Sequence, residues 1–126
     1  MSNIYTNFKA KLSTNALTTI YTVPAEKAAI IKSIRVSNED TANDCNISVF
    51  LVDSNSISYN LETDRTIQAK RSQEILATGN MAQDTSDSSV AAPAPLIAKE
   101  SEKIQAQAQN GNDLSIIISV LEISSR

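Results

Sequence analysis

The stretch from Leu17 to Asn38, LTTIYTVPAEKAAIIKSIRVSN, constrains the fold more than any other part of the chain. Residues 18–23 are β-branched or aromatic, which suits the pleated and half-buried surface of a strand. Pro24 ends this strand, because proline has no N–H for the ladder and holds a fixed φ. A polar corner follows, and residues 28–36 resume as a second apolar strand. The segment therefore predicts strand, tight corner and strand.

Residues 45–52 alternate with the period of two that is typical of a strand. One face is apolar, and the other begins polar and becomes apolar at its end. The preceding residues 38–44 are dense in turn formers, whose side chains bond their own backbone. We therefore expect residues 30–37 and 45–52 to form an antiparallel pair.

The end of the chain alternates as well. Residues 103–109, KIQAQAQ, alternate strictly, and Asn110-Gly111 readily takes the positive φ values of a hairpin turn. Residues 114–123 are apolar on much of both faces, which predicts a central strand. Many short strands separated by turns predict an all-β fold, a single antiparallel β-sandwich of jelly-roll-like arrangement.

Two segments do not fit this simple alternation. Residues 60–76 favour a helix by propensity, yet their few apolar residues give a poor helical stripe. Residues 77–95 are small and polar with two prolines. A loop of this length in a compact domain is usually functional or disordered. The 126 residues predict one domain: an N-terminal arm or edge strand over 1–11, and a sandwich over 12–126 that carries the long inserted loop.

Composition excludes several classes of function. The chain has no histidine, so catalytic triads and the commonest metal ligand are missing. With two glycines far apart, no phosphate-cradling loop can form. The net charge of −3 comes without a basic stripe, so we expect no nucleic-acid binding. No apolar run is long enough for a membrane span, and the lone Cys45 is expected to be a small buried hydrophobe. We expect no cofactor and no enzymatic activity.

Acidic residues offer two further candidate sites. Glu62 with Asp64, or Glu100 with Glu102, could act as paired acids of the glycosidase kind. We expect them instead to be solvated surface residues, because charged side chains are mostly exposed. Residues 84–88 could supply oxygen ligands to calcium, but they lack the ordered carboxylates and the glycine of a calcium loop. We therefore expect no metal site.

Three motifs, taken together, resemble those of a known family. They are YTVPA at 21–25, IKSIRVSN at 31–38 and SVLEI at 119–123. Their order resembles that of the short β-sandwich structural proteins found among bacteriophage virion genes, of tailed and cyanophage-like phages. The resemblance spans nearly the whole chain.

The resemblance also bears on the two irregular segments. In the family, a segment comparable to 60–76 runs as strand, Pro-Ala-Gly turn and strand. Here Gln68 stands for the proline and Lys70 for the glycine, and one helical turn remains the alternative. Family members are shorter at 77–95, which implies an insertion there.

By this resemblance the chain is a non-enzymatic virion structural protein, assembled in the cytoplasm of a bacterial host. We expect a capsid decoration or cement protein that docks on the capsid lattice as a homo-oligomer, possibly a trimer, with residues 2–11 as a tether. The alternatives are a neck, tail or fibre-associated virion protein, whose partners would be neck or tail proteins, and a carbohydrate-binding β-sandwich module. The candidate interface residues are apolar: Ile4, Tyr5, Phe8, Phe50, Val52, Tyr59, Ile117, Leu121 and Ile123. They could instead cover a second layer of the same sandwich.

Overall fold

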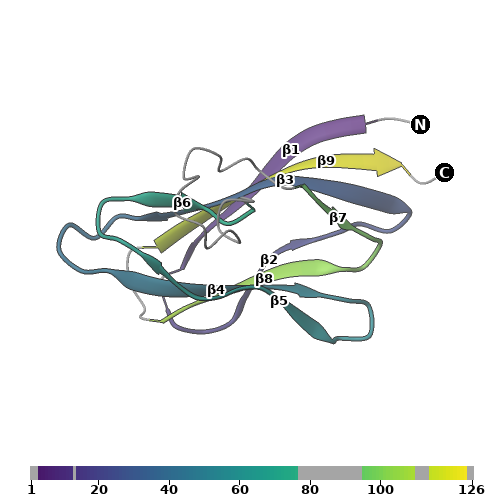
Figure 1. The fold of residues 1–126 in the computed structure, drawn as a ribbon. Helices are drawn as coiled ribbons and strands as arrows, with labels where there is room; N and C mark the ends of the chain where they lie inside the picture. The colour runs from purple at the N-terminus through teal and green to yellow at the C-terminus, as the bar shows by residue number, and fades with distance from the viewer. Residues whose placement is uncertain (1–2, 13, 77–94, 110–113, 125–126) are drawn as a thin grey trace, which may run out of the picture.

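The computed structural model describes residues 3–12, 14–76, 95–109 and 114–124. Within these ranges the chain forms nine strands, arranged as two antiparallel sheets that lie one above the other (Figure 1). The prediction of an all-β antiparallel sandwich is therefore confirmed. None of the described residues belongs to a helix that is long and apolar enough to cross a membrane.

Sheet A has five strands and sheet B has four. Sheet A runs in the order β1 (Asn3–Leu12), β9 (Leu114–Ser124) and β3 (Lys27–Asn38), with β6 (Ser72–Glu74) and β7 (Leu96–Ala98) both on the far edge of β3. Sheet B runs in the order β2 (Thr18–Thr22), β8 (Lys103–Ala108), β4 (Cys45–Val52) and β5 (Ser58–Ile67).

The strand pairings are nested along the chain. β4 pairs with β5, β3 with β6 and β7, β2 with β8, and β1 with β9. The chain thus resembles one long hairpin that is rolled across two sheets. Most connections cross from one sheet to the other.

This nesting corrects two expectations. β3 and β4 lie in different sheets, so the predicted pairing of 30–37 with 45–52 is wrong. The short polar segment between them crosses the end of the sandwich. β8 and β9 also lie in different sheets and do not form a hairpin. Residues 110–113, which join them, lie outside the described residues, as do the proposed loop at 77–94 and the calcium candidates at 84–88.

The core lies between the inner faces of the two sheets. β9 is central, as predicted, since β1 and β3 flank it. Its inner face is fully buried, but its outer face is only half-buried or exposed, and none of the described strands covers it. Cys45 is buried, as expected. The largest fully buried side chains are Leu12, Ile31, Ile34, Ile47, Ile67, Ile104, Leu114, Ile116, Ile118, Val23, Val36 and Val49.

Residues 3–12 form a strand along their whole length. β1 pairs with β9 from Asn3 opposite Ile123 to Leu12 opposite Leu114. Leu12 is 1% exposed. The structure therefore favours the edge strand over the free arm, because residues 3–11 of the expected tether lie in β1.

The ambiguous segment at 60–76 contains β5, a turn and β6 rather than a helix. In the turn, Arg71 N donates to Gln68 O at 3.0 Å. Lys70 has a φ of 64°, in the left-handed region that favours glycine. Lys70 stands where the resemblance places a glycine, and it adopts the left-handed conformation that a glycine would favour there.

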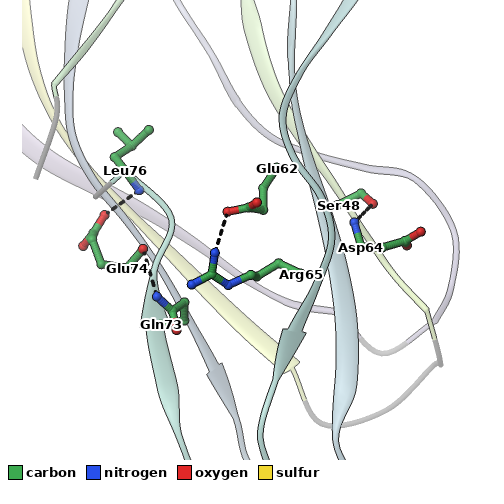
Figure 2. A network of polar contacts seen from close by, with 7 residues as sticks. All are labelled: Ser48, Glu62, Asp64, Arg65, Gln73, Glu74 and Leu76. Atoms are coloured by element: carbon green, nitrogen blue, oxygen red, sulfur yellow. Dashed lines mark hydrogen bonds and ion pairs between the residues drawn. The ribbon is translucent and has the colours of Figure 1, made fainter. Parts of the chain in front are cut away.

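Glu74 closes a gap in sheet A between β6 and β7. β6 pairs with residues 35–37 of β3 and β7 with residues 29–31, so neither strand pairs with Ile34 on this edge of β3, while β9 pairs with it on the other edge. Ile34 N donates to Glu74 Oε2 at 2.8 Å. Leu76 N donates to the same oxygen at 3.2 Å (Figure 2). The Ser33 hydroxyl donates to Glu74 Oε1. One carboxylate therefore takes the place of a missing ladder partner.

We expect Glu74→Ala to lower the free energy of unfolding by about 1–3 kcal/mol, because it removes the acceptor of two backbone N–H groups and a hydroxyl. Urea unfolding followed by circular dichroism measures this. Glu62→Ala is the matched control, because it also removes a glutamate with a polar partner. Glu62 Oε1 lies 3.4 Å from Arg65 Nη1 (Figure 2). We expect it to cost less than about 1 kcal/mol. Equal losses in the two variants would contradict the role of Glu74.

Candidate docking surface

The outer face of sheet B is polar, and its side chains bond one another. Gln105 Nε2 donates to Thr19 Oγ1 at 2.8 Å, and Thr66 Oγ1 donates to Asn46 Oδ1 at 2.8 Å. Ser48 accepts a hydrogen bond from a backbone N–H of β5 at 3.0 Å (Figure 2). This face is typical of the solvated side of an antiparallel sandwich.

The outer face of sheet A carries an apolar row across four strands. Tyr5 of β1 lies opposite Leu121 of β9, Leu121 lies opposite Ile30 of β3, and Ile30 lies opposite Ile97 of β7. Directly opposite residues share one face of a sheet. Tyr5 is 74% exposed and Ile97 is 67% exposed.

The neighbouring row extends this surface, since Ile123 lies opposite Ala28. We call the combined surface the apolar patch. Exposed apolar patches commonly mark interaction sites. Its members are Tyr5, Ala28, Ile30, Ile97, Leu121 and Ile123.

The other half of the same face is basic. Lys9 and Arg35 lie on either side of Ile117, which is 41% exposed. Lys11 lies next along β1, and its Nζ is 2.9 Å from Glu39 Oε1. We call Lys9, Lys11, Lys32 and Arg35 the basic strip.

Two hollows lie along this face, where β1 runs beside β9. One has a volume of about 450 Å³ and the other about 310 Å³. The larger is lined by Lys9, Ala10, Lys11, Ser115, Ile116 and Ile117. The smaller is lined by Tyr5, Thr6, Asn7, Lys32, Ser119 and Val120. The outer face of sheet A is therefore apolar at one half and basic at the other. It is also hollowed where a partner's side chains could enter.

The nine candidate interface residues do not form one surface. Tyr5, Ile117, Leu121 and Ile123 lie together on the outer face of sheet A. Ile4, at the end of β1, lies opposite Glu122 and is 44% exposed.

The remaining candidates lie elsewhere in the fold. Phe8 packs against Tyr21 of β2, with ring centroids 4.4 Å apart. Val52 is 4% exposed, in keeping with the alternative that some of these residues cover the sandwich's own layers. Phe50 of β4 is half-buried, and Tyr59 of β5 is 53% exposed. Both belong to sheet B.

Sequence reasoning missed Ile30 and Ile97, which complete the apolar row. Ile30 is adjacent to the buried Ile31, and an Ile-Ile pair does not say which side chain faces outward. Ile97 lies in a strand of three residues, too short to show alternation. The register between strands was needed to find both.

A buried carboxylate lies on the inner face of β9. Glu122 is 7% exposed, and the Tyr21 hydroxyl of sheet B donates to its Oε2 at 2.7 Å. Lys27 Nζ lies 3.8 Å from its Oε1. Burial raises the pKa of Tyr21, and the hydrogen bond to Glu122 and its charge raise it further. This contact joins the two sheets and is not open to a substrate.

Of the four acids expected to be solvated, Glu100 and Glu102 accept hydrogen bonds from backbone N–H groups at turns. Glu100 Oε2 accepts a hydrogen bond from Glu26 N at 3.0 Å, and Glu102 Oε1 accepts one from Lys99 N at 2.7 Å. In the part of the chain that the structure describes, no group of three or more His, Cys, Asp or Glu residues could hold a metal ion.

Comparisons with known proteins give structural neighbours only. No protein-family model and no curated protein matches the chain. A chain from the acidic stable capsid structure of Helicobacter pylori bacteriophage KHP30 aligns with 99% of this chain and 90% of its own length, at 14% identity and a TM-score of 0.48.

Two structures of infectious bursal disease virus show a weaker likeness. A chain of the Gx strain covers 94% of this chain at 6% identity and a TM-score of 0.45. A chain of the VP2 subviral particle covers 98% at 9% identity and a TM-score of 0.44. This chain spans only about a third of their lengths, 31% and 32%. The neighbours are chains from structures of viral particles. The likeness is one of fold alone, so we argue function from the chain's own residues.

Proposed function

We propose that this chain is a non-enzymatic structural protein of a bacteriophage virion, which docks on the capsid lattice as a decoration or cement protein. The observation that supports this most is the apolar patch on the outer face of sheet A. It combines with the motif resemblance at 21–25, 31–38 and 119–123. Under this proposal the protein's location is the virion, and its partner is the major shell protein.

The patch is suited to docking because it is rigid as well as apolar. Its residues come from four strands held in one hydrogen-bonded sheet. Little conformational entropy would therefore be lost when a partner covers it, which favours binding. The outer face of sheet B offers no comparable surface, because its polar side chains already bond one another.

The nested strand order supports a jelly roll, an architecture that encloses two Greek keys in two sheets. We propose that copies associate, possibly as a trimer. Each contact with the shell could then be weak, since several linked contacts raise the overall strength of attachment. A neck, tail or fibre position would use the same surface on a different partner.

The carbohydrate-binding alternative is less well supported. A polar hollow of about 340 Å³ lies between β5 and β6. Its lining has no aromatic side chain on which a sugar ring could stack, and consists of Arg65, Thr66, Ile67, Gln68, Arg71, Ser72 and Gln73.

Paired aromatic and aliphatic variants test the docking face. We expect Tyr5→Asp with Ile97→Asp to lower incorporation into particles by roughly tenfold or more, because it places charges at the two most exposed apolar positions of the patch. The matched control is Tyr59→Asp with Ile57→Asp, since these residues are 53% and 51% exposed but lie outside sheet A. Quantitative mass spectrometry of purified particles measures incorporation, and thermal unfolding confirms that both variants fold. Equal incorporation of the two pairs would contradict docking through sheet A.

A further inference from the structure

We infer that the surface docked on sheet A belongs to a different protein and is acidic, with apolar side chains that enter the two hollows between carboxylates. This inference rests on the proposed function and adds the chemistry of the partner.

The charge of this face is opposite to that of the whole chain. The chain carries a net charge of −3, yet the outer face of sheet A holds the basic strip of Lys9, Lys11, Lys32 and Arg35. Two acidic residues adjoin it. Glu39 is paired with Lys11 at 2.9 Å, and Glu74, opposite Arg35, binds the backbone N–H groups of Ile34 and Leu76. Basic groups therefore outnumber acidic ones on the one face that is also apolar.

The hollows combine the same two kinds of group. In the larger, Ile117 supplies exposed apolar surface, while Lys9 and Lys11 come from the adjacent strand. In the smaller, Tyr5 supplies exposed apolar surface and Lys32 supplies the charge. Interfaces typically have an apolar centre and a polar rim. An apolar side chain in each hollow, flanked by carboxylates, would satisfy both features.

Charge favours a different protein over a second copy as the occupant. A two-fold pair uses the same surface on both subunits, so that residue i of one subunit contacts residue j of the other and the reverse. Two copies joined through this hollowed face would place both basic strips in one interface, where acidic groups are fewer than basic ones, and like charges within an interface are costly. An acidic partner surface would instead be attracted, and the attraction would weaken with salt.

The test measures binding of the purified chain to particles of the encoding virus that lack it, by cosedimentation at about 50 mM and about 500 mM NaCl. We expect the affinity of the natural chain to fall by roughly tenfold or more over this range. At the lower salt, Lys9→Glu with Arg35→Glu should bind about tenfold more weakly than the natural chain. The matched control, Lys70→Glu with Arg71→Glu, reverses one lysine and one arginine at the turn between β5 and β6. It should bind as the natural chain does.

The outcomes separate this inference from the proposed function. Binding of the natural chain that is insensitive to salt and to Lys9→Glu with Arg35→Glu would overturn the acidic partner and leave the virion proposal standing. Absence of binding by the natural chain would overturn both. Sedimentation equilibrium of the purified chain addresses the second copy. A homo-oligomer that dissociates in the Lys9→Glu with Arg35→Glu variant, but not in the control, would show that a second copy occupies this face.

Discussion

A chain that lacks residues 2–11 should show no cooperative unfolding transition. These residues supply most of β1, and their loss would expose the edge of β9, the central strand of sheet A. The contact between the rings of Phe8 and Tyr21 would also be lost. We expect this loss, together with that of the hydrogen bonds between β1 and β9, to lower the free energy of unfolding by about 5 kcal/mol or more, which is comparable to the whole stability of a small domain.

Thermal and urea unfolding of the truncated chain measure this, with the full chain as reference. Leu12→Ala provides a second test at the end of the strand, because Leu12 is 1% exposed. We expect it to cost about 2–5 kcal/mol. Lys9→Ala is the control, since this side chain lies on the outer face. A truncated chain that melts cooperatively within a few degrees of the full chain would restore the interpretation of residues 2–11 as a free tether.

Glu122→Ala should also have a large effect, a loss of about 2–4 kcal/mol in the free energy of unfolding. In the natural protein the buried Tyr21 hydroxyl donates to Glu122 Oε2 at 2.7 Å, and the substitution removes this acceptor. It also removes the carboxylate that Lys27 approaches to 3.8 Å. An unsatisfied buried donor costs more than the hydrogen bond contributes, so a single substitution should be worse than removing both groups.

A double-mutant cycle isolates this contact. Tyr21→Phe with Glu122→Ala should cost less than the sum of the two single substitutions, because neither group is then left without its partner. Additive losses would contradict a direct coupling between the two residues.

The pH dependence gives an independent signature of the same contact. Since the fold raises the pKa of Tyr21 above its ordinary value of 10.0, the unfolded chain releases this proton first. Stability is thus retained below pH 10 and falls as the pH rises above it. The decline should be shallower in Tyr21→Phe than in the natural chain, as measured by urea unfolding between about pH 9 and pH 11.

Local patterns in the sequence were sufficient to predict the strands but not their neighbours. The alternation in residues 45–52 and 103–109 identifies β4 and β8, because a half-buried strand imposes a period of two. It does not show which strand lies beside them. A short polar connection is compatible with a hairpin or with a crossing between sheets, and the connection between β3 and β4 is of the second kind. Contacts between residues far apart in the chain decide this.

The same reasoning explains what was missed at the docking surface. Tyr5, Ile117, Leu121 and Ile123 could be chosen as exposed apolar residues, but only the register brings Ile30 and Ile97 into one row with Tyr5 and Leu121. The basic strip is also hidden in the sequence, since its members come from two strands that β9 separates.

Glu122, by contrast, left a signal in the sequence. The buried face of β9 runs through Leu114, Ile116, Ile118 and Val120, and the next residue with the same period is Glu122. A carboxylate that is buried on an apolar face requires polar partners. The alternation of β9 alone therefore indicates a buried polar contact at Glu122. Glu74 left no such signal, because its role depends on a gap between two strands that both pair with β3.

The measurement that tests the central claim most directly is the copy number of this chain in purified particles, relative to the major shell protein, by quantitative mass spectrometry. The account predicts a copy number close to that of the shell protein, because a decoration protein repeats with the lattice on which it docks. A few copies per particle would move the protein to the neck, tail or fibres. Absence from the particles would contradict the claim that it is a virion structural protein.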